Sequence, residues 1–193
     1  MPWEKSFDEE DVLAKAMHVF WDKGYDSASI SDLVDCTGIN KGSLYNTFGG
    51  KKQLFVKALL KYDQEVRRAL LAELEALDDP KKAISTLLDN LVEETIEDSQ
   101  KKGCFLINTA SEIATHEGEV IEIVTRGLNE MEAFLRRCIE VGQVRDDFSS
   151  DLDPKATATA LLGVIVAIRV LGRGVFDRPA LETIADQGKR LVA

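Results

Sequence analysis

The chain has 193 residues, of which 45% are hydrophobic and 30% are charged, and its formal net charge at pH 7 is -10. This length and hydrophobic content allow one large domain or two small ones with a substantial core. An acidic surface repels phosphate, so the total charge alone argues against a nucleic-acid partner.

Compartment signals are few. The three cysteines, at positions 36, 104 and 138, have no paired spacing, which argues against a disulfide framework or a zinc knuckle and favours a reducing cytoplasm. The acidic start "MPWEKSFDEED" has no hydrophobic run, so no signal peptide is expected. The longest uncharged run, Ala156–Ile168, is shorter than the roughly 20 residues that a membrane span needs, and it predicts a buried helix. We expect no membrane partner.

Helical spacing of hydrophobic residues dominates the sequence, and no sustained alternation predicts strands. The expected fold is all-α, with about nine helices. Ser6 and Glu9 can form a capping box for a first helix that ends at Gly24. Ser29 is the expected N-cap of a second, short helix that ends at Gly38, and Asn40 is the expected N-cap of a third.

A long helix is expected from about Lys51 to Leu77. Prolines mark helix starts beyond it, because Pro80 and Pro154 each follow an aspartate and Pro179 follows Asp177 and Arg178. The remaining helices are expected near residues 80–97, 104–115, 117–142, 154–172 and 179–192.

The two short helices and the turn between them have the features of a helix-turn-helix. Gly38 supplies the positive φ that a tight turn needs, and Ile39 is expected to fix the angle between the helices by packing between them. Lys41, Gly42 and Ser43 then form the leading turn of the third helix, where slim polar residues could enter a major groove.

The charge distribution supports this interpretation more than the total does. Residues 1–62 contain eight lysines and nine carboxylates, whereas residues 63–193 contain 16 basic and 25 acidic residues. The segment Cys36–Tyr62 contains five lysines and no carboxylate. This basic segment is expected to contact a polyanion, although for any one lysine taken alone a solvated helical face is the better interpretation.

The stretch "SISDLVDCTGINKGSLYNTFGGKKQLF", residues 29–55, resembles the DNA-binding signature of the TetR family of bacterial regulators. The resemblance implies a helix-turn-helix DNA-binding domain at residues 1–50 and a helical ligand-binding and dimerisation domain at residues 51–193. It also implies a homodimeric, ligand-relieved repressor with a double-stranded DNA operator and a small-molecule effector, without cofactor or enzymatic activity. By this resemblance the residues nearest the bases are Ser31, Lys41, Gly42 and Tyr45, and those that hold the DNA backbone are Ser29, Ser43, Asn46, Thr47 and Lys51.

The signature departs from the family pattern at three positions. Ala28 stands where a threonine is common, so one hydroxyl for a phosphate is missing. Cys36 replaces a small alanine, and Thr47 stands where histidine is common. The motif remains intact, but the operator sequence does not follow from it.

The second part of the chain contains "KKGCFLINTASEIA", residues 101–114, which is similar to a segment beside the effector pocket in one subgroup of TetR-like regulators, some of which respond to electrophiles. Cys104 would stand at a helix N-terminus, where the dipole, Lys101 and Lys102 could lower a thiol pKa and make it a sensor. A buried cysteine that fills space is the alternative.

One helical face of that segment could line a hydrophobic pocket with polar anchors, together with a phenylalanine from a later helix. The predicted ligand-binding residues are Cys104, Phe105, Asn108, Thr109, Glu112 and Phe134. Core packing is an equally good interpretation of the two phenylalanines. Glu112, His116 and Glu119 have a spacing that a metal site could use, but a solvated helix end is the commoner outcome, and no metal is expected.

The Ala- and Gly-rich stretch "ATATALLGVIVAIRVLG", residues 156–172, is hydrophobic on nearly all sides and must be covered by other helices. In the TetR family the last two helices form a four-helix bundle with a second copy, which favours a dimer over an internal helix of a monomer. An enzyme built in a helical bundle and an adaptor whose lysines bind protein are the two competing functions. The two histidines lie 98 residues apart, at 18 and 116, and no nucleophile–base spacing accompanies them, which weakens the first.

Overall fold

The computed structural model describes residues 7–193, and in this range the regular structure is entirely helical. The elements are α1 (Glu9–Lys23), α2 (Ile30–Thr37), α3 (Lys41–Phe48), α4 (Lys51–Tyr62), η1 (Asp63–Arg68), α5 (Ala69–Glu75), α6 (Pro80–Glu97), α7 (Phe105–Ser111), η2 (Ile113–Thr115), α8 (Glu119–Val144), α9 (Pro154–Leu171) and α10 (Arg178–Arg190). Because α4, η1 and α5 are continuous and η2 is a single turn after α7, the described chain has nine helical segments, which confirms the predicted all-α fold.

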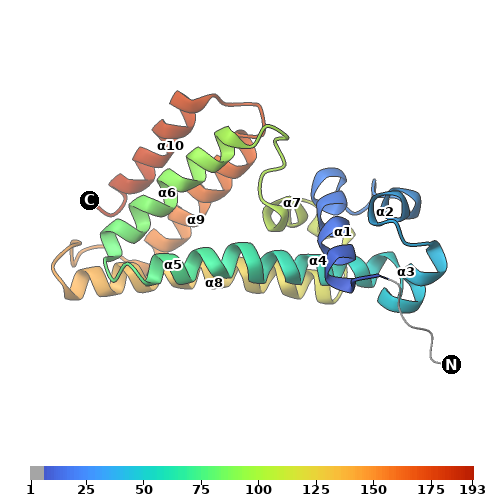
Figure 1. Ribbon diagram of the computed structural model, residues 1–193. Coiled ribbons are helices and arrows are strands. Elements are labelled where there is room, and N and C mark those ends of the chain that lie inside the picture. The colour runs from blue at the N-terminus through green and yellow to red at the C-terminus, as the bar shows by residue number, and fades with distance from the viewer. Residues whose placement is uncertain (1–6) are drawn as a thin grey trace.

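Two long rods run along the molecule (Figure 1). One is α4–η1–α5 and the other is α8. Helices α1, α2 and α3 lie at one end of the rods, and α6, α9 and α10 pack above the other end. We call α1–α3 the reading head, and α5, α6 and α8–α10 the body; α7 lies between these two parts.

Helix starts follow the local sequence signals closely. Where a side-chain cap was predicted within the described residues, that side chain accepts a hydrogen bond from a backbone N–H of the first turn: Ser29, Asn40, Asp79, Asp153 and Asp177. Ser29 and Asp32 form a complete capping box. Ser6, the predicted cap of the first helix, lies outside the described residues, and the side chain of Asp8 caps α1.

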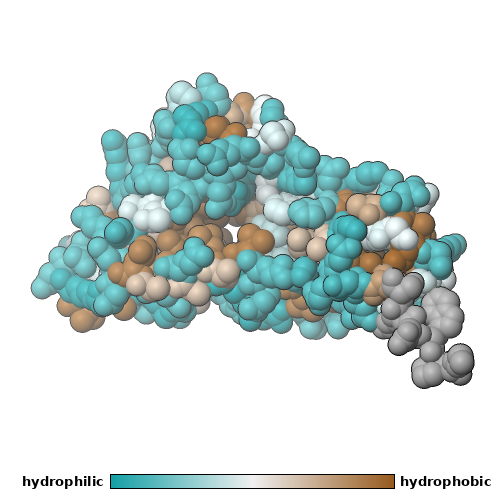
Figure 2. Space-filling model, viewed as in Figure 1, coloured by the Kyte–Doolittle hydropathy of each residue, from teal (hydrophilic) through white to brown (hydrophobic). Residues whose placement is uncertain are grey.

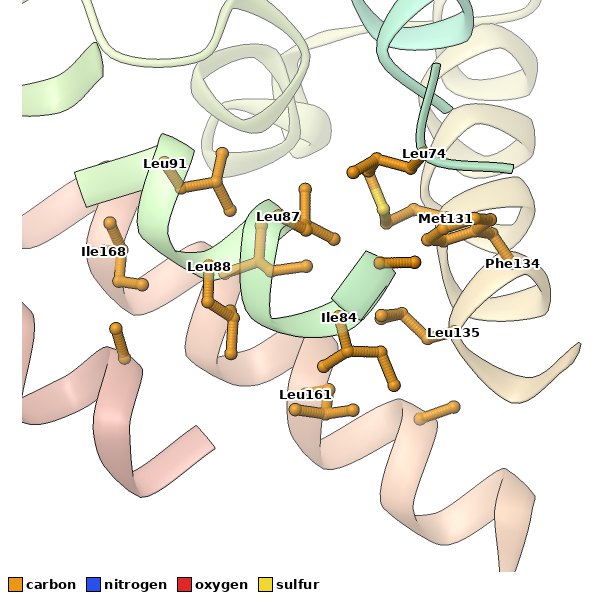
Figure 3. Close-up of a cluster of buried hydrophobic side chains, with 14 of the residues drawn as sticks. Leu74, Ile84, Leu87, Leu88, Leu91, Met131, Phe134, Leu135, Leu161 and Ile168 are labelled. Carbon is orange, nitrogen blue, oxygen red and sulfur yellow. The ribbon is translucent and has the colours of Figure 1, made fainter. Parts of the chain in front are cut away.

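The core of the body is formed by side chains from the helices α5 to α10, several of which are labelled in Figure 3. Ile84, Leu87 and Leu88 of α6 are at most 1% exposed. These side chains belong to one cluster with Phe134 of α8 and Leu161 of α9. Helix α6 is therefore the centre of the body core.

The core of the reading head continues into the body. Leu33 of α2, Leu44 of α3 and Leu59 of α4 are fully buried in one cluster that also includes Phe105 of α7 and Val120 of α8. The head is therefore not an isolated bundle, because its hydrophobic surface is covered in part by α7 and by the start of α8.

The predicted helix over residues 51–77 is interrupted, which is a correction to the sequence analysis. Asp63–Arg68 winds as a π-helix, and regular α-helix ends at Glu75. Arg67 Nε donates to Asp63 Oδ1 at 2.5 Å, and Arg67 also donates to Glu130 of α8. Burial opposes the charge of Arg67, but these bonds outweigh it and raise its pKa. A charged cluster inside the rod was not visible in the hydrophobic pattern.

Helix α9 is less buried than the sequence predicted. It is the one helix of the described chain that is long and hydrophobic enough to span a membrane by length and composition, yet only 22% of it is buried in the single chain. Only one face, with Ala158, Leu161, Ile165 and Ile168, packs into the body. Hydrophobic surface is also visible on the body in Figure 2, between α6 and the rods.

Candidate nucleic-acid interface and effector pocket

The turn between α2 and α3 is built as the sequence predicted. Gly38 has φ +76° and ends α2, and no atom lies within 4 Å of the place where its Cβ would be. The positive φ, and not lack of space, therefore requires glycine there. Ile39 is 6% exposed and packs in the head core. This buried side chain holds α3 at a fixed angle to α2.

Helix α3 has one buried and one open face. Leu44 and Phe48 are buried, whereas Lys41, Gly42, Tyr45 and Asn46 are exposed. A Cβ on Gly42 would meet only Asn40 Oδ1, at 3.3 Å. The structure thus brings four of the predicted DNA-binding residues to one open face, with room beside Gly42 for a close approach.

The predicted serines differ in availability. The Ser29 hydroxyl already donates to Asp32 Oδ2 at 2.8 Å and accepts from the Asp32 backbone N–H at 3.0 Å. Ser31 is exposed, with its hydroxyl 3.4 Å from Asp35 Oδ2. Ser43 is only 9% exposed, and its backbone N–H already donates to the cap Asn40. Ser43 is the least available of the three for a phosphate.

Two residues lie at the margin of the open face. Thr47 is half-buried. The Lys51 ammonium lies 4.5 Å from the centre of the Tyr25 ring, and its Nζ donates to the Asp26 carbonyl at 3.4 Å. Lys51 is therefore held against the α1–α2 loop rather than extended into solvent, and it would have to leave or share these contacts to reach a phosphate.

Two carboxylates, at positions 32 and 35, lie on α2 beside the basic segment. Lys23 Nζ donates to Asp32 Oδ1 at 2.6 Å, and this bond, with those from Ser29, holds the pKa of Asp32 well below its ordinary value. Asp35 is exposed, with its carboxylate beside the Ser31 hydroxyl. The acid-free stretch of sequence is therefore not an acid-free surface.

The main predicted ligand residues meet at the seam between head and body. A cavity of about 160 Å³ is bordered by the C-terminal end of α1, by α7 and by the end of α9. Phe105, Asn108, Thr109 and Glu112 line it, because their spacing places them on one side of α7. Phe134 does not; it lines a separate groove of about 230 Å³ beside Cys138, at the far end of the body. Grouping Phe134 with the other four was therefore wrong.

Cys104 lies beside the seam and is not among the residues that line its cavity. It is the N-cap residue of α7 and is half-buried, and the Tyr62 hydroxyl donates to its Sγ at 3.4 Å. Burial first, and then the neighbouring thiol, raises the pKa of Tyr62 well above its ordinary value. Tyr62 therefore stays a neutral donor to the sulfur.

Within residues 7–193, no group of three or more His, Cys, Asp or Glu side chains comes close enough to bind a metal ion. His116 is buried, and its ring lies parallel to Phe55 at 5.4 Å and edge-on to Tyr25 at 5.4 Å. His116 thus packs α4 and the head against the turn before α8.

Helix α3 has an open polar face, and the buried Ile39, directly after the positive-φ Gly38, holds it at a fixed angle to α2. These features define a helix-turn-helix regulator. Residues 12–58 match the family described as bacterial regulatory proteins, tetR family, and residues 80–185 match the tetracyclin repressor-like, C-terminal domain. The second match covers more than half of the chain, so the chain belongs to the TetR family. It is a transcriptional regulator and not an enzyme.

Relatives and solved structures agree with this assignment. The chain is 29% identical over 183 residues to the uncharacterized HTH-type transcriptional regulator YezE of Bacillus subtilis, with 94% of each chain covered. It is 28% identical over 191 residues to the HTH-type transcriptional repressor ComR of Escherichia coli, with 97% of this chain and 90% of ComR covered. A cysteine mutant of the TetR family transcriptional regulator CifR, complexed with 26bp double-strand operator DNA, has a TM-score of 0.85 and 26% identity, with 98% of each chain covered.

Sequence reasoning missed two residues that complete the seam. Trp21 of α1 and Arg173, just beyond α9, line the cavity together with the α7 residues. These two residues are far from α7 in the sequence, and neither belongs to a local motif. Only the packing of α1 and α9 on either side of α7 brings them together.

Proposed function

We propose that this regulator is a dimeric repressor that binds an operator in double-stranded DNA and leaves it when a small molecule occupies the protein. The repressor name of ComR and the operator complex of the CifR mutant support this by similarity. A bacterial regulator that binds operator DNA would act in the cytoplasm. The observation that carries the proposal is the open face of α3, with Lys41, Gly42, Tyr45 and Asn46 exposed together.

In this proposal residues 1–50 are the DNA-binding domain and residues 51–193 bind the ligand and dimerise. The first turn of α3 enters the major groove, where Gly42 lets the backbone approach the bases and Lys41 and Tyr45 contact them. Ser31 lies nearby on α2. The residues proposed to hold the DNA backbone are Ser29, Ser43, Asn46, Thr47 and Lys51, with the hydroxyl of Ser43 contributing least because it is buried.

The partner in the dimer is a second copy of this chain. The exposed, small and hydrophobic residues of α9 support this, because a second α9 can approach closely where side chains are short. Gly163 is exposed, and nothing lies within 4 Å of the place of its Cβ. Two reading heads would then contact half-sites about one helical turn, roughly 34 Å, apart.

The effector is proposed to bind in the seam cavity. Its walls belong to the head on one side and to α7 and α9 on the other, so a molecule that enters must change how the two parts fit. The Glu112 carboxylate and Asn108 offer polar contacts, and Phe105 offers a hydrophobic wall. Cys104, one residue before α7, is the proposed site for an electrophile.

Selection from a randomised pool of double-stranded oligonucleotides tests DNA binding. The chain should enrich a two-fold symmetric sequence. Lys41→Ala should then weaken binding to it by roughly 1 to 3 kcal/mol per half-site and relax the preference at the bases that Lys41 contacts. Lys81→Ala, an exposed change in the body, is the control and should leave both unchanged. Failure of the wild type to enrich any sequence at moderate salt would exclude the proposal.

Operator release in the presence of a library of small molecules tests the effector site. For compounds that release the operator, Glu112→Gln should lower potency about tenfold, the usual scale for losing a hydrogen bond to a charged group. Glu117→Gln, an exposed carboxylate outside the seam cavity, is the matched control. Equal potency on both variants would show that the effector does not bind beside Glu112 in the seam cavity.

A further inference from the structure

The segment Asp98–Cys104, which connects α6 to α7, is held in a tight conformation; we call it the strap. Asp98 Oδ2 accepts from the Gly103 N–H at 3.1 Å, and Asp98 Oδ1 accepts from the Gln100 N–H at 3.1 Å. Lys101 and Gly103 both have positive φ, +54° and +66°. A connection with internal bonds and two left-handed residues has a defined shape and is not a loose loop.

The strap is anchored to the body next to the end of α9. Arg173 Nε donates to the Lys101 carbonyl at 3.0 Å, and Asn108 Nδ2 donates to the Lys102 carbonyl at 2.7 Å. A Cβ on Gly103 would lie 2.9 Å from Arg173 Cδ and 3.1 Å from the Arg169 carbonyl oxygen. Space as well as φ therefore favours glycine at 103, and the strap lies directly against the end of α9.

The opposite side of the strap contacts the reading head through one side chain of α1. Trp21 Nε1 donates to the Gly103 carbonyl at 3.1 Å, across 82 residues of sequence. The Trp21 ring lies edge-on to Tyr62 at 4.9 Å, and the Lys102 ammonium lies 5.8 Å from its centre. A phenylalanine could fill much of this space, but only the indole N–H can make the directional bond to the strap.

We propose that Trp21 is a positioning residue for operator recognition: its bond to Gly103 fixes the angle of the reading head relative to α9, and so sets the separation of the two heads in the dimer. This inference rests on the proposed dimeric DNA-binding function. The strap links α1 by hydrogen bonds to the end of the helix that would meet the second copy. The position of the strap on Trp21 is set by this directional bond, next to the buried contacts of Phe105 and Val120 that join the head to the rest of the chain.

The test compares operators that differ only in the spacing of their half-sites. The starting operator is the sequence that the wild-type chain enriches, and variants carry one or two base pairs inserted or removed at the centre. Wild-type affinity should fall at least tenfold at the altered spacings. Trp21→Phe should lose about threefold to tenfold at the original spacing, the scale of one hydrogen bond, and should bind the altered spacings within about threefold of it.

Affinity for a single half-site separates positioning from structure, since a merely destabilised head would lose affinity for half-site and full operator alike. Trp21→Phe should leave half-site affinity unchanged. His18→Ala is the matched control, because His18 is exposed and stacks on Trp21 at 6.3 Å without bonding the strap; it should keep the wild-type spacing profile. Arg173→Met, which removes the side chain that bonds the strap to the end of α9, should reproduce the Trp21→Phe profile.

Two results would overturn the inference. One is a wild-type spacing profile in both Trp21→Phe and Arg173→Met. The other is an equal loss of half-site and full-operator affinity in both variants. A wild-type chain that enriches no two-fold operator would instead refute the proposed function, so the two failures can be told apart.

Discussion

The reading head and helix α9 use their hydrophobic residues in different ways. In the head, Leu33, Leu44 and Phe48 are all buried within the single chain, and each short helix has its own cap. In α9, only 22% of the helix is buried, although it alone among the described helices is hydrophobic and long enough to span a membrane. The head is thus completed by its own chain, whereas α9 has surface that its own chain does not cover. Local signals and contacts within one chain can thus complete one region of a protein, whereas another region is completed only when a second copy of the chain covers it.

The largest expected effect separates these two regions. Gly163→Glu should leave the monomer folded, because nothing lies within 4 Å of the new Cβ and glycine is a poor helix former. It should prevent a second α9 from packing there, and the loss of one linked half-site should lower operator affinity about 100- to 10,000-fold. Light scattering and titration of the full operator measure both. Gly163→Ala is the control. A Gly163→Glu protein that remains dimeric would show that a second copy does not pack on this face of α9.

The junction between the regions should be the next most sensitive place. Arg67→Met leaves the Asp63 carboxylate, 3% exposed, without its closest partner, and should cost about 3 kcal/mol of unfolding free energy. Arg68→Met removes the second guanidinium on this carboxylate, 3.2 Å from Asp63 Oδ2. The Arg68 side chain is 41% exposed and Arg67 still pairs with Asp63, so this change should cost about 1 kcal/mol or less. Urea unfolding followed by circular dichroism compares them. Equal costs would show that the buried ion pair does not stabilise the rod.

Within the head, the capping box gives a smaller effect. Ser29→Ala removes the side chain that accepts the Asp32 N–H and should cost about 1 kcal/mol. Ser27→Ala, two residues earlier and exposed, is the control and should change the free energy of unfolding by only a few tenths of a kcal/mol. If the two variants have the same free energy of unfolding, the cap at Ser29 does not stabilise the head.

The last effect concerns a body thiol, and it changes a reaction rate rather than stability or binding. Burial raises the pKa of Cys138 to about 11. The thiolate is the reacting form, and the smaller thiolate fraction is partly offset by the higher nucleophilicity of a more basic thiolate. Alkylation of Cys138 by iodoacetamide at pH 8 should therefore be about tenfold slower than that of an ordinary thiol, and its rate should rise with pH up to about 11. Because the folded pKa is raised, this thiol stabilises the fold below about pH 9 and loses that contribution as pH rises toward about 11. Peptide mass spectrometry after timed alkylation would show the rate, with exposed Cys36 as the reference.

How much could be predicted from the sequence depended on how far apart the interacting residues are. The caps Ser29 and Asn40 and the turn at Gly38 follow from residues within four positions of one another, and the structure has all three as expected. The α7 residues were expected together because a helix puts every third or fourth residue on one face. Trp21 was not included with them, because contacts between distant helices leave no local pattern.

Two further differences have the same origin. Phe134 was grouped with the seam residues, but it lies on α8 at the far end of the body. The π-helical turn at Asp63–Arg68 was not expected, since charged residues in the middle of a helix usually indicate its solvated side. Here Glu130, more than 60 residues away, makes burial of Arg67 possible. No residue near position 67 in the sequence indicates that Glu130 is its partner.

The π-helical turn also has a bearing on how chain length can vary. Leu59, Asp63, Arg67 and Leu71 are all buried and are spaced by four residues, a spacing that drifts about 40° per step around a regular α-helix. The wider turn absorbs this drift, so one rod serves the head core and the body core on the same side. Deletion of one residue inside η1 would restore a regular α-helical turn and keep the orientation of the head. The same deletion in α4 or α5 would rotate the head by about 100° about the axis of the rod. The change of register between the head core and the body core is therefore absorbed in one turn of the rod, where Arg67 meets Glu130.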